Sequence, residues 1–371
     1  MHRERGGLGC SNNRPRSLTR FRTRSPPLSA AARQGTDIAP LELQLLHQST
    51  QPESRVKTLL CLLITLASSL ASAQGWPSRP IRVVVPFPPG GSTDIATRPV
   101  ADRLSQALGQ SVVVENRSGA GGNIGTEMVA KSAPDGYTVL IATDAVASNP
   151  HTYKNLGYQT LKDFIPVVQL SRQPVVMAVH PSLGVNTLAE LVALARQKPG
   201  LGFATSGAGS QQHMTGEWFA KLAGVQLTHV PYKGGGQAIT DLVAGQVPLG
   251  SLGSSPLIPH YKAGKLKLIA QSTRTRSAAL PEVPTYEESG YKGLVIEQWL
   301  GVMVAAGTPA EIVARLNAEI NKALNDATVR ERYFQAAQEP LGGTPEQFGR
   351  LIREDYEKYG RLVKELNIKV E

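Results

Sequence analysis

The chain has 371 residues, with 39 Lys and Arg, 29 Asp and Glu, and two cysteines, Cys10 and Cys61. Ten of the basic and four of the acidic residues lie in residues 1–73, so the net charge of +10 falls to +4 in residues 74–371. So small an excess does not favour a nucleic-acid partner. A chain without cysteine after residue 61 has no disulfide framework or thiolate chemistry there, and 298 residues suffice for two packed domains.

An export signal is predicted at residues 55–73. Arg55 and Lys57 precede an apolar run from Leu59 to Leu70, and the segment ends in an A-x-A cleavage site at Ala73. The run is shorter than the roughly 20 apolar residues of a membrane-spanning helix. We therefore expect cleavage after Ala73 and a periplasmic mature protein.

Residues 1–54 precede this signal, although signal peptides stand at the start of a chain. They are rich in Arg, Ser and Pro and show no apolar period. They are predicted to be a non-native or disordered N-terminal extension, with Val56 as a candidate for the true translation start.

Short β-branched runs then alternate with amphipathic segments, which predicts βαβ units and parallel sheets. A helix is expected at 92–108, kinked by Pro99, and another after Thr187, where Glu190 completes a capping box. The predicted strands are Ile81–Val85, Val112–Glu115, Thr138–Ala142, Val175–Val179, Leu201–Ala204, Leu227–Val230, Pro248–Leu252 and Leu266–Ala270.

The C-terminal part shows two helical periods without intervening strands. Each follows a Thr-Pro start signal, at Thr308 and at Thr344. Extended segments at 167–179 and 294–304 bracket the second βα series, as in a chain that crosses to a second domain and returns. The predicted boundaries are 74–174 for domain 1, 175–298 for domain 2, and 299–371 for the return to domain 1 with C-terminal helices.

The stretch PFPPGGSTD at 86–94 directly follows the first strand. Gly90-Gly91 can take backbone angles closed to other residues, and Ser92 or Thr93 can cap the next helix, with Asp94 in its first turn. A helix N-terminus offers unpaired N–H groups and a partial positive charge, which together form an anion site. The alternative is an ordinary tight βα turn.

A second stretch, FATSGAGSQQH at 203–213, repeats this arrangement, with a helix expected from about Ser210. Two such turns at the carboxyl ends of strands, one in each domain, lie where open α/β sheets bind ligands. A dinucleotide fingerprint is excluded, because Gln212 stands where its third glycine belongs, and the glycines at 119–125 also have the wrong spacing. The sequence contains no P-loop.

Catalytic and metal-binding constellations are weak. The histidines after residue 73 show no HxxxH or HExxH spacing, and no GxSxG nucleophile motif is present. We therefore expect no catalytic residue, no metal and no cofactor. A secreted hydrolase or metal enzyme using Asp94, Asp144 and His213 remains an alternative, although these residues are scattered over motifs without catalytic spacing.

Several motifs in order, including PFPPGGSTDIATR, GQSVVVENRSGAGGNIGTEMVAKSAPDGYT, FATSGAGSQQHMTGEWF and VPYKGGGQAITDLVAGQV, resemble the Bug family of exported solute receptors. These are the binding proteins of tripartite tricarboxylate transporters. The resemblance runs from about Trp76 to the C-terminus. It implies an α/β periplasmic-binding-protein fold of type II, with two crossing strands and an interdomain cleft. It also implies a bound organic anion whose carboxylate is held mainly by main-chain N–H groups and waters.

The resemblance further implies a non-enzymatic, monomeric receptor that closes about a hinge and delivers its ligand to membrane subunits. A receptor that signals to a sensor kinase is the alternative. The ligand is a small organic acid: a dicarboxylate, an amino acid or an aromatic carboxylate. The predicted ligand-binding residues are Phe87, Gly90, Gly91, Ser92, Thr93 and Asp94; Thr143, Asp144, Ser148 and Asn149; Ser206, Gly207, Ala208, Gly209, Ser210 and His213; and Lys233.

Overall fold

The computed structural model describes residues 75–368, so the predicted signal peptide and extension lie outside the described residues. The strands form one ten-stranded sheet in the order β2-β1-β3-β9-β4-β7-β5-β6, and β8 and β10 each pair with β4. The strands are β1 Ile81–Val85, β2 Val112–Asn116, β3 Thr138–Thr143, β4 Phe164–Val179, β5 Leu201–Thr205, β6 Leu227–Pro231, β7 Leu249–Gly253, β8 Lys267–Gln271, β9 Glu297–Ala305 and β10 Glu339–Gly342.

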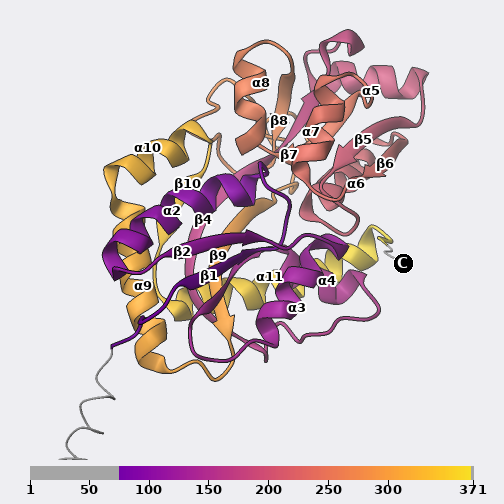
Figure 1. Ribbon diagram of the computed structural model, residues 1–371. Coiled ribbons are helices and arrows are strands. Elements are labelled where there is room, and N and C mark those ends of the chain that lie inside the picture. The colour runs from indigo at the N-terminus through magenta and orange to yellow at the C-terminus, as the bar shows by residue number, and fades with distance from the viewer. Residues whose placement is uncertain (1–74, 369–371) are drawn as a thin grey trace, which may run out of the picture. The chain divides into compact units, whose positions relative to one another are not determined.

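The helices lie between these strands and at the C-terminal end, as Figure 1 shows. They are α2 Ser92–Leu108, α3 Asn123–Ala130, α4 Ala145–Thr152, α5 Leu188–Gln197, α6 Gln211–Ala223, α7 Gly235–Val243, α8 Ile258–Lys262, α9 Ala310–Asn325, α10 Ala327–Gln335 and α11 Pro345–Glu365. Among residues 75–368, no helix is both long and apolar enough to cross a membrane.

Strand β4 is the structural link between two α/β lobes. Its first part, Phe164–Pro174, pairs antiparallel with β9, and its last part, Val175–Val179, pairs antiparallel with β7 and β8. The first lobe contains β1–β3 and β9, and the second contains β5–β8. Strands β4 and β9 are the crossing strands expected from the sequence, although β4 begins at Phe164, earlier than predicted. The α/β class is confirmed.

The inner strands of each lobe are buried on both faces, because their alternating side chains enter core clusters with helices on either side of the sheet. In the first lobe, Val83 and Val85 belong to a core cluster with helices α2 and α9, whereas Val84 contacts a cluster that includes Phe348 of α11. In the second lobe, Val176 and Met177 likewise enter separate clusters. Each fully buried side chain of this size stabilises the fold by about 1.5–3 kcal/mol.

The C-terminal region differs from the prediction in one element. Strand β10 lies between α10 and α11 and pairs antiparallel with β4, from Glu339 opposite Arg172 to Gly342 opposite Gln169. Arg172 also binds the Glu339 carboxylate, with Nε 2.7 Å from Oε2. The expectation of helices without an intervening strand was therefore wrong, because a strand of four residues is too short to show a period.

The three predicted helix starts agree with the structure to different degrees. The capping box at Thr344 is present in full. At α5, the Thr187 side chain accepts from the Glu190 N–H, but the Glu190 carboxylate accepts from Asn186 instead of Thr187. At α9, Thr308 is not the N-cap: its hydroxyl donates to the Ala305 carbonyl, and the helix begins one residue later than predicted.

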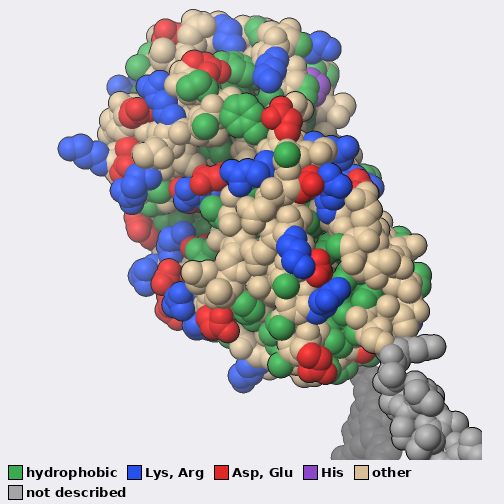
Figure 2. All heavy atoms as spheres, turned by 90° about the vertical axis from the view of Figure 1, so that its left-hand side faces the viewer, with side chains coloured by type: hydrophobic (Ala, Val, Ile, Leu, Met, Phe, Trp, Pro, Cys, Tyr) green, Lys and Arg blue, Asp and Glu red, His purple; other side chains and the backbone are tan. Residues whose placement is uncertain are grey.

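The surface of the described chain carries mixed charges. Figure 2 shows Lys and Arg interspersed with Asp and Glu over the face that it presents, rather than gathered into a field of one sign. Several of these charges are paired, as in the contact between Arg103 of α2 and Asp326 before α10, at 2.8 Å. The pairing ties the long helix of the first lobe to its C-terminal helices.

Candidate functional site

A polar pocket lies between the two lobes. Its first-lobe wall is the turn after β1 with the start of α2, and its second-lobe wall is formed by Ser206, Gln212, the start of α7 and the end of β7. Gln298 of β9 closes it from the crossing strands. The space free of atoms is about 400 Å³ including the open mouth, but only about 30 Å³ is wide enough for the centre of a water molecule.

The first turn presents a helix N-terminus to this pocket. The N-cap of α2 is Gly91, in an extended conformation (φ −81°, ψ 170°), and no side chain caps the helix. Ser92 and Thr93 are therefore the first helical residues, which corrects the expectation that one of them caps it. Among residues 75–368, no acceptor is bonded to the backbone N–H of Ser92 or Thr93. Both residues line the pocket, so the positive end of the helix faces it.

The two glycines of the turn play different roles. Gly90 has φ +80°, in the region that L side chains rarely adopt. Gly91 has φ −81°, which any residue can adopt. The expectation that both glycines need special backbone angles therefore holds only for Gly90. Gly91 is buried and lines the pocket together with Phe87.

Asp94 stabilises the turn through hydrogen bonds and is not among the residues that line the pocket. Its carboxylate accepts from the Gly90 N–H at 3.1 Å, from Arg98 Nε at 2.9 Å and Nη2 at 2.7 Å, and from Asn116 Nδ2 at 3.1 Å. Burial raises the pKa of Asp94, but the bonds from Arg98, Gly90 and Asn116 outweigh it and the net pKa is lowered. The carboxylate thus shapes the turn while Arg98 balances its charge.

The second turn occupies its expected place, but most of its N–H groups are already bonded. The N–H of Ser206 donates to Gln212 Oε1 at 2.8 Å, that of Gly207 to the Thr205 hydroxyl, and that of Gly209 to His213 Nδ1 at 3.1 Å. Ser210 caps α6 with its side chain, and the helix begins at Gln211, close to the predicted start at about Ser210. Of the predicted residues in this turn, Ser206 lines the pocket, whereas Gly207, Ala208, Gly209 and Ser210 do not.

His213 is stacked on His229, away from the pocket lining. The ring centroids are 3.6 Å apart and nearly parallel. Burial, together with the neighbouring His213, lowers the pKa of His229 to about 3. His229 Nε2 lies 2.7 Å from the Thr205 hydroxyl. Lys233 is exposed and does not line the pocket, so neither His213 nor Lys233 is brought to it.

The predicted residues of α4 form a separate buried cluster. Asn149 Nδ2 donates to Asn123 Oδ1 and to the Gly121 carbonyl, and the Thr143 hydroxyl accepts from the Ala145 N–H. Burial, together with the nearby Asp355, raises the pKa of Asp144 well above its usual range. None of Thr143, Asp144, Ser148 and Asn149 lines the interlobe pocket. Their role as ligand contacts stays a prediction.

The residues named for the alternative hydrolase or metal enzyme, Asp94, Asp144 and His213, do not form one site. Asp94 is bonded to Arg98, Asp144 is the buried N-cap residue of α4, and His213 stacks on His229, so the three side chains have different surroundings. Within residues 75–368, no group of three potential metal ligands is present.

Sequence reasoning missed the lining residues Gln298 and Gln212, and the apolar wall of Ile239, Leu252 and Pro256. Gln298 lies on a crossing strand and follows no glycine-rich turn, so no local signal marked it. Gln212 was noted only as the residue that breaks a dinucleotide motif, although its place in the first turn of α6 positions it beside the pocket.

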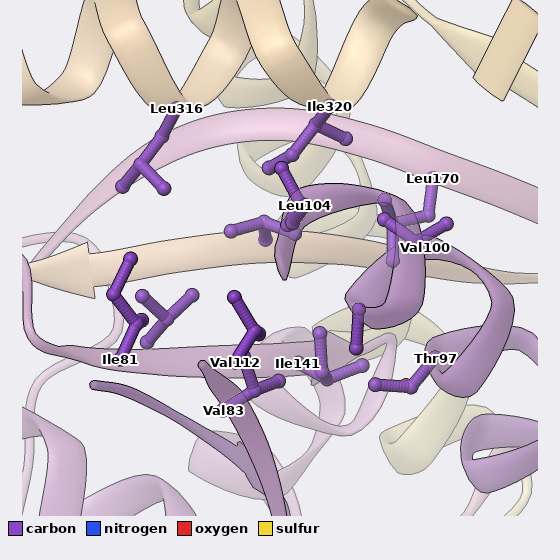
Figure 3. A pocket seen from close by; sticks show the side chains of 13 residues that line it. Ile81, Val83, Thr97, Val100, Leu104, Val112, Ile141, Leu170, Leu316 and Ile320 are labelled. Carbon is purple, nitrogen blue, oxygen red and sulfur yellow. The ribbon is translucent and has the colours of Figure 1, made fainter. Parts of the chain in front are cut away.

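A second cavity, in the first lobe, has a different character. It lies between the sheet and helices α2 and α9, and Figure 3 shows its aliphatic side chains, such as Val83, Leu104 and Ile320, converging on it. Only about 20 Å³ of this cavity is wide enough for the centre of a water molecule. Thr97 is its one polar lining side chain, and its hydroxyl donates to the Thr93 carbonyl. An apolar gap of this kind has no group to bind an anion.

Comparisons with known proteins agree with the fold. The chain is 36% identical to Protein BugT of Bordetella pertussis over 322 residues, covering 85% of this chain and 99% of the relative. A Rhodopseudomonas palustris protein solved with adipate is 36% identical, with a TM-score of 0.77, over 79% of this chain and 99% of that one. MatC from Rhodopseudomonas palustris with bound malate is 31% identical, with a TM-score of 0.73, over 78% and 100%.

The structure of the periplasmic binding protein BugD is also similar, at 32% identity and a TM-score of 0.77, over 80% of this chain and 100% of that chain. These neighbours confirm the two-domain periplasmic-binding-protein fold. Residues 96–368 match the model of the tripartite tricarboxylate transporter family receptor. The resemblance found in the sequence motifs is thereby confirmed, and the chain belongs to this family of solute-binding receptors.

Proposed function

We propose that the chain is a periplasmic, non-enzymatic receptor that captures a small organic carboxylate in the interlobe pocket. The observation that carries the proposal is the N-terminus of α2, where Ser92 and Thr93 line a pocket without charged side chains and their N–H groups have no acceptor within the described residues. An anion in such a site is held by backbone donors and the helix dipole.

The solved relatives support a carboxylate as the ligand class. One was solved with adipate and another with malate, and this chain aligns with 99% and 100% of those two proteins. In this chain, Asp94 and Arg98 neutralise each other beneath the turn, so the α2 N-terminus keeps its positive character without a side-chain cation.

Ligand entry requires the lobes to separate. Only about 30 Å³ of the pocket is wide enough for the centre of a water molecule, about two probe spheres by volume, so an acid enters only after the lobes have moved apart. The crossing strands β4 and β9 connect the lobes and are the place for a hinge. We propose the domain boundaries at 174/175 and 298/299 accordingly.

Delivery to the membrane subunits of a tripartite transporter completes the proposal. It rests on the family to which residues 96–368 belong and on the predicted signal peptide. Deletion of the gene should abolish uptake of the bound acid, and should leave uptake intact if the protein only reports the acid to a sensor kinase.

A thermal-shift screen of organic acids tests the binding step. A ligand that binds only the folded state raises its stability, by about 2.7 kcal/mol at a hundredfold excess over Kd. We expect at least one carboxylate to raise the melting temperature while its amide analogue does not. Equal stabilisation by the amide, or none by any carboxylate, contradicts an anion site.

A further inference from the structure

Two side-chain amides line the pocket, and backbone groups fix the orientation of both. The first is Gln212, which is 4% exposed. Its Oε1 accepts from the backbone N–H of Ser206 at 2.8 Å. A backbone N–H can only donate, so the oxygen of Gln212 must face Ser206. The Nε2 group, with two N–H donors, is left on the other side of the amide.

The second amide, Gln298, is oriented through an intermediate. Gln173 is 1% exposed, and its Oε1 accepts from the backbone N–H of Ser255 at 3.2 Å and from the Ser255 hydroxyl at 2.6 Å. The Nε2 of Gln173 must therefore point the other way, where it donates to Gln298 Oε1 at 2.6 Å. Gln298 then has its oxygen occupied and its Nε2 free of any bond within the described residues.

The same network continues away from the pocket, which holds Gln173 in place. The Ser255 hydroxyl accepts from Gln338 Nε2 at 2.8 Å, and Gln338 Oε1 accepts from the Ser171 hydroxyl at 2.6 Å. Ser171, Ser255 and Gln338 are all buried. A reversed Gln173 amide would set its Nε2 against the Ser255 N–H and leave buried groups unpaired, which costs about 1–3 kcal/mol for each group.

We propose that Gln212 and Gln298 are specificity-determining donors for a second, hydrogen-bond-accepting group of the ligand, in addition to the carboxylate at α2. This inference rests on the proposed function. With both amide oxygens occupied, the pocket offers amide N–H donors in addition to those at the start of α2, and no Asp or Glu lines it. The ligand is then an acid whose second end accepts hydrogen bonds, such as a dicarboxylate, and an ammonium group finds no counter-ion.

Matched pairs of acids test this inference by calorimetry at neutral pH. The pairs are succinate and L-aspartate, glutarate and L-glutamate, and adipate and L-2-aminoadipate, which differ only by the ammonium group. We expect at least one dicarboxylate to bind at least tenfold more tightly than its amino partner. Equal or tighter binding of the amino acid overturns the inference while the proposed function stands. Binding of monocarboxylates alone also overturns the inference and leaves the proposed function standing. If no carboxylate binds, the inference and the proposed function are both overturned.

Gln298→Glu isolates the contribution of the amide. The new carboxylate can still accept from Gln173 Nε2, so the network survives, but its second oxygen replaces the donor. We expect the dicarboxylate to bind at least tenfold more weakly, and the ratio of amino-acid to dicarboxylate affinity to rise at least tenfold. Gln226→Glu, the same charge change at an exposed position, should leave both unchanged. Equal weakening of both acids by Gln298→Glu would show a structural role only and overturn the inference.

Discussion

Pro88 and Gly234 lie against each other across the interlobe pocket. A Cβ atom built on Gly234 would stand 2.6 Å from Cδ and 2.9 Å from Cγ of the Pro88 ring. Pro88 belongs to the turn before α2, and Gly234 to the turn after β6, in the segment PYKGGG. The second-lobe turn thus packs directly on the turn before α2, and its glycine is needed for the close approach of the lobes.

Gly234→Ala should therefore oppose closure. The added methyl meets the Pro88 ring only when the lobes are together, so it penalises the closed, ligand-bound state more than an open one. We expect the affinity for the bound carboxylate to fall by more than about tenfold, or about 1.4 kcal/mol, when measured by calorimetry.

The double variant Pro88→Ala/Gly234→Ala supplies the control, because alanine at 88 removes the ring atoms Cγ and Cδ. It should recover most of the lost affinity. Gly234 also has φ +154°, and this backbone strain persists in the double variant. If Pro88→Ala brings no recovery, the loss is due to strain and the interlobe contact is not what limits binding.

The first turn should depend on Gly90 more than on Gly91. A β-branched residue at φ +80° is strained, and Gly90→Val would distort the turn that its N–H ties to Asp94. We expect Gly90→Val to weaken binding by more than about tenfold. Gly91→Ala has an allowed backbone and its Cβ would lie 3.8 Å from the Pro88 carbonyl oxygen, so it should cost less. Calorimetry on both variants, after a melting curve for each, gives the comparison; a larger loss for Gly91→Ala contradicts the assignment.

The sequence predicted the place of this turn, between β1 and α2, because strand, glycine and helix signals coincide within 86–94; its role in binding stays a prediction. It did not predict Gln298, which reaches the pocket only because β9 returns beside β4, a long-range pairing that no local pattern records. It also overestimated the second turn, since the bonds from Ser206 to Gln212 and from Gly209 to His213 depend on side-chain rotamers. Motif position follows from local sequence, whereas which donors remain free follows from tertiary contacts.

Stability should fall in acid because of His229. Its pKa is lowered to about 3 in the folded chain, against about 6.5 when unfolded. The unfolded state therefore binds a proton first as the pH falls, so the stabilisation present above pH 6.5 is lost progressively between about 6.5 and 3. The loss from this one group is at most about 1.4 kcal/mol per pH unit.

His229→Gln should flatten this part of the profile, because glutamine does not titrate and can still bond to the Thr205 hydroxyl. Urea unfolding between pH 7 and pH 4.5 measures the free energy of unfolding for both proteins. His260→Gln, at a helix end far from this stack in the sequence, is the matched control and should keep the slope. A slope in His229→Gln as steep as in the parent chain would assign the acid sensitivity to other groups.

Gly253, at the end of β7, tests whether the donor network and the pocket act together. A Cβ there would lie 2.6 Å from Gln298 Oε1, 2.7 Å from Ser92 Oγ and 2.9 Å from Gln173 Nε2. Gly253 has no positive φ, so the backbone accepts alanine and the clash falls on these three side chains. Gly253→Ala should displace the Gln298 amide and weaken binding of the carboxylate by more than about tenfold.

Gly349→Ala in α11 is the control for Gly253→Ala. Its Cβ would meet neighbours only at 3.5 Å, and a helical Gly→Ala change adds about 0.5–1 kcal/mol of stability. We expect Gly349→Ala to raise the melting temperature at unchanged affinity. If Gly253→Ala binds the carboxylate as tightly as the parent chain does, none of these three side chains needs its present position for binding.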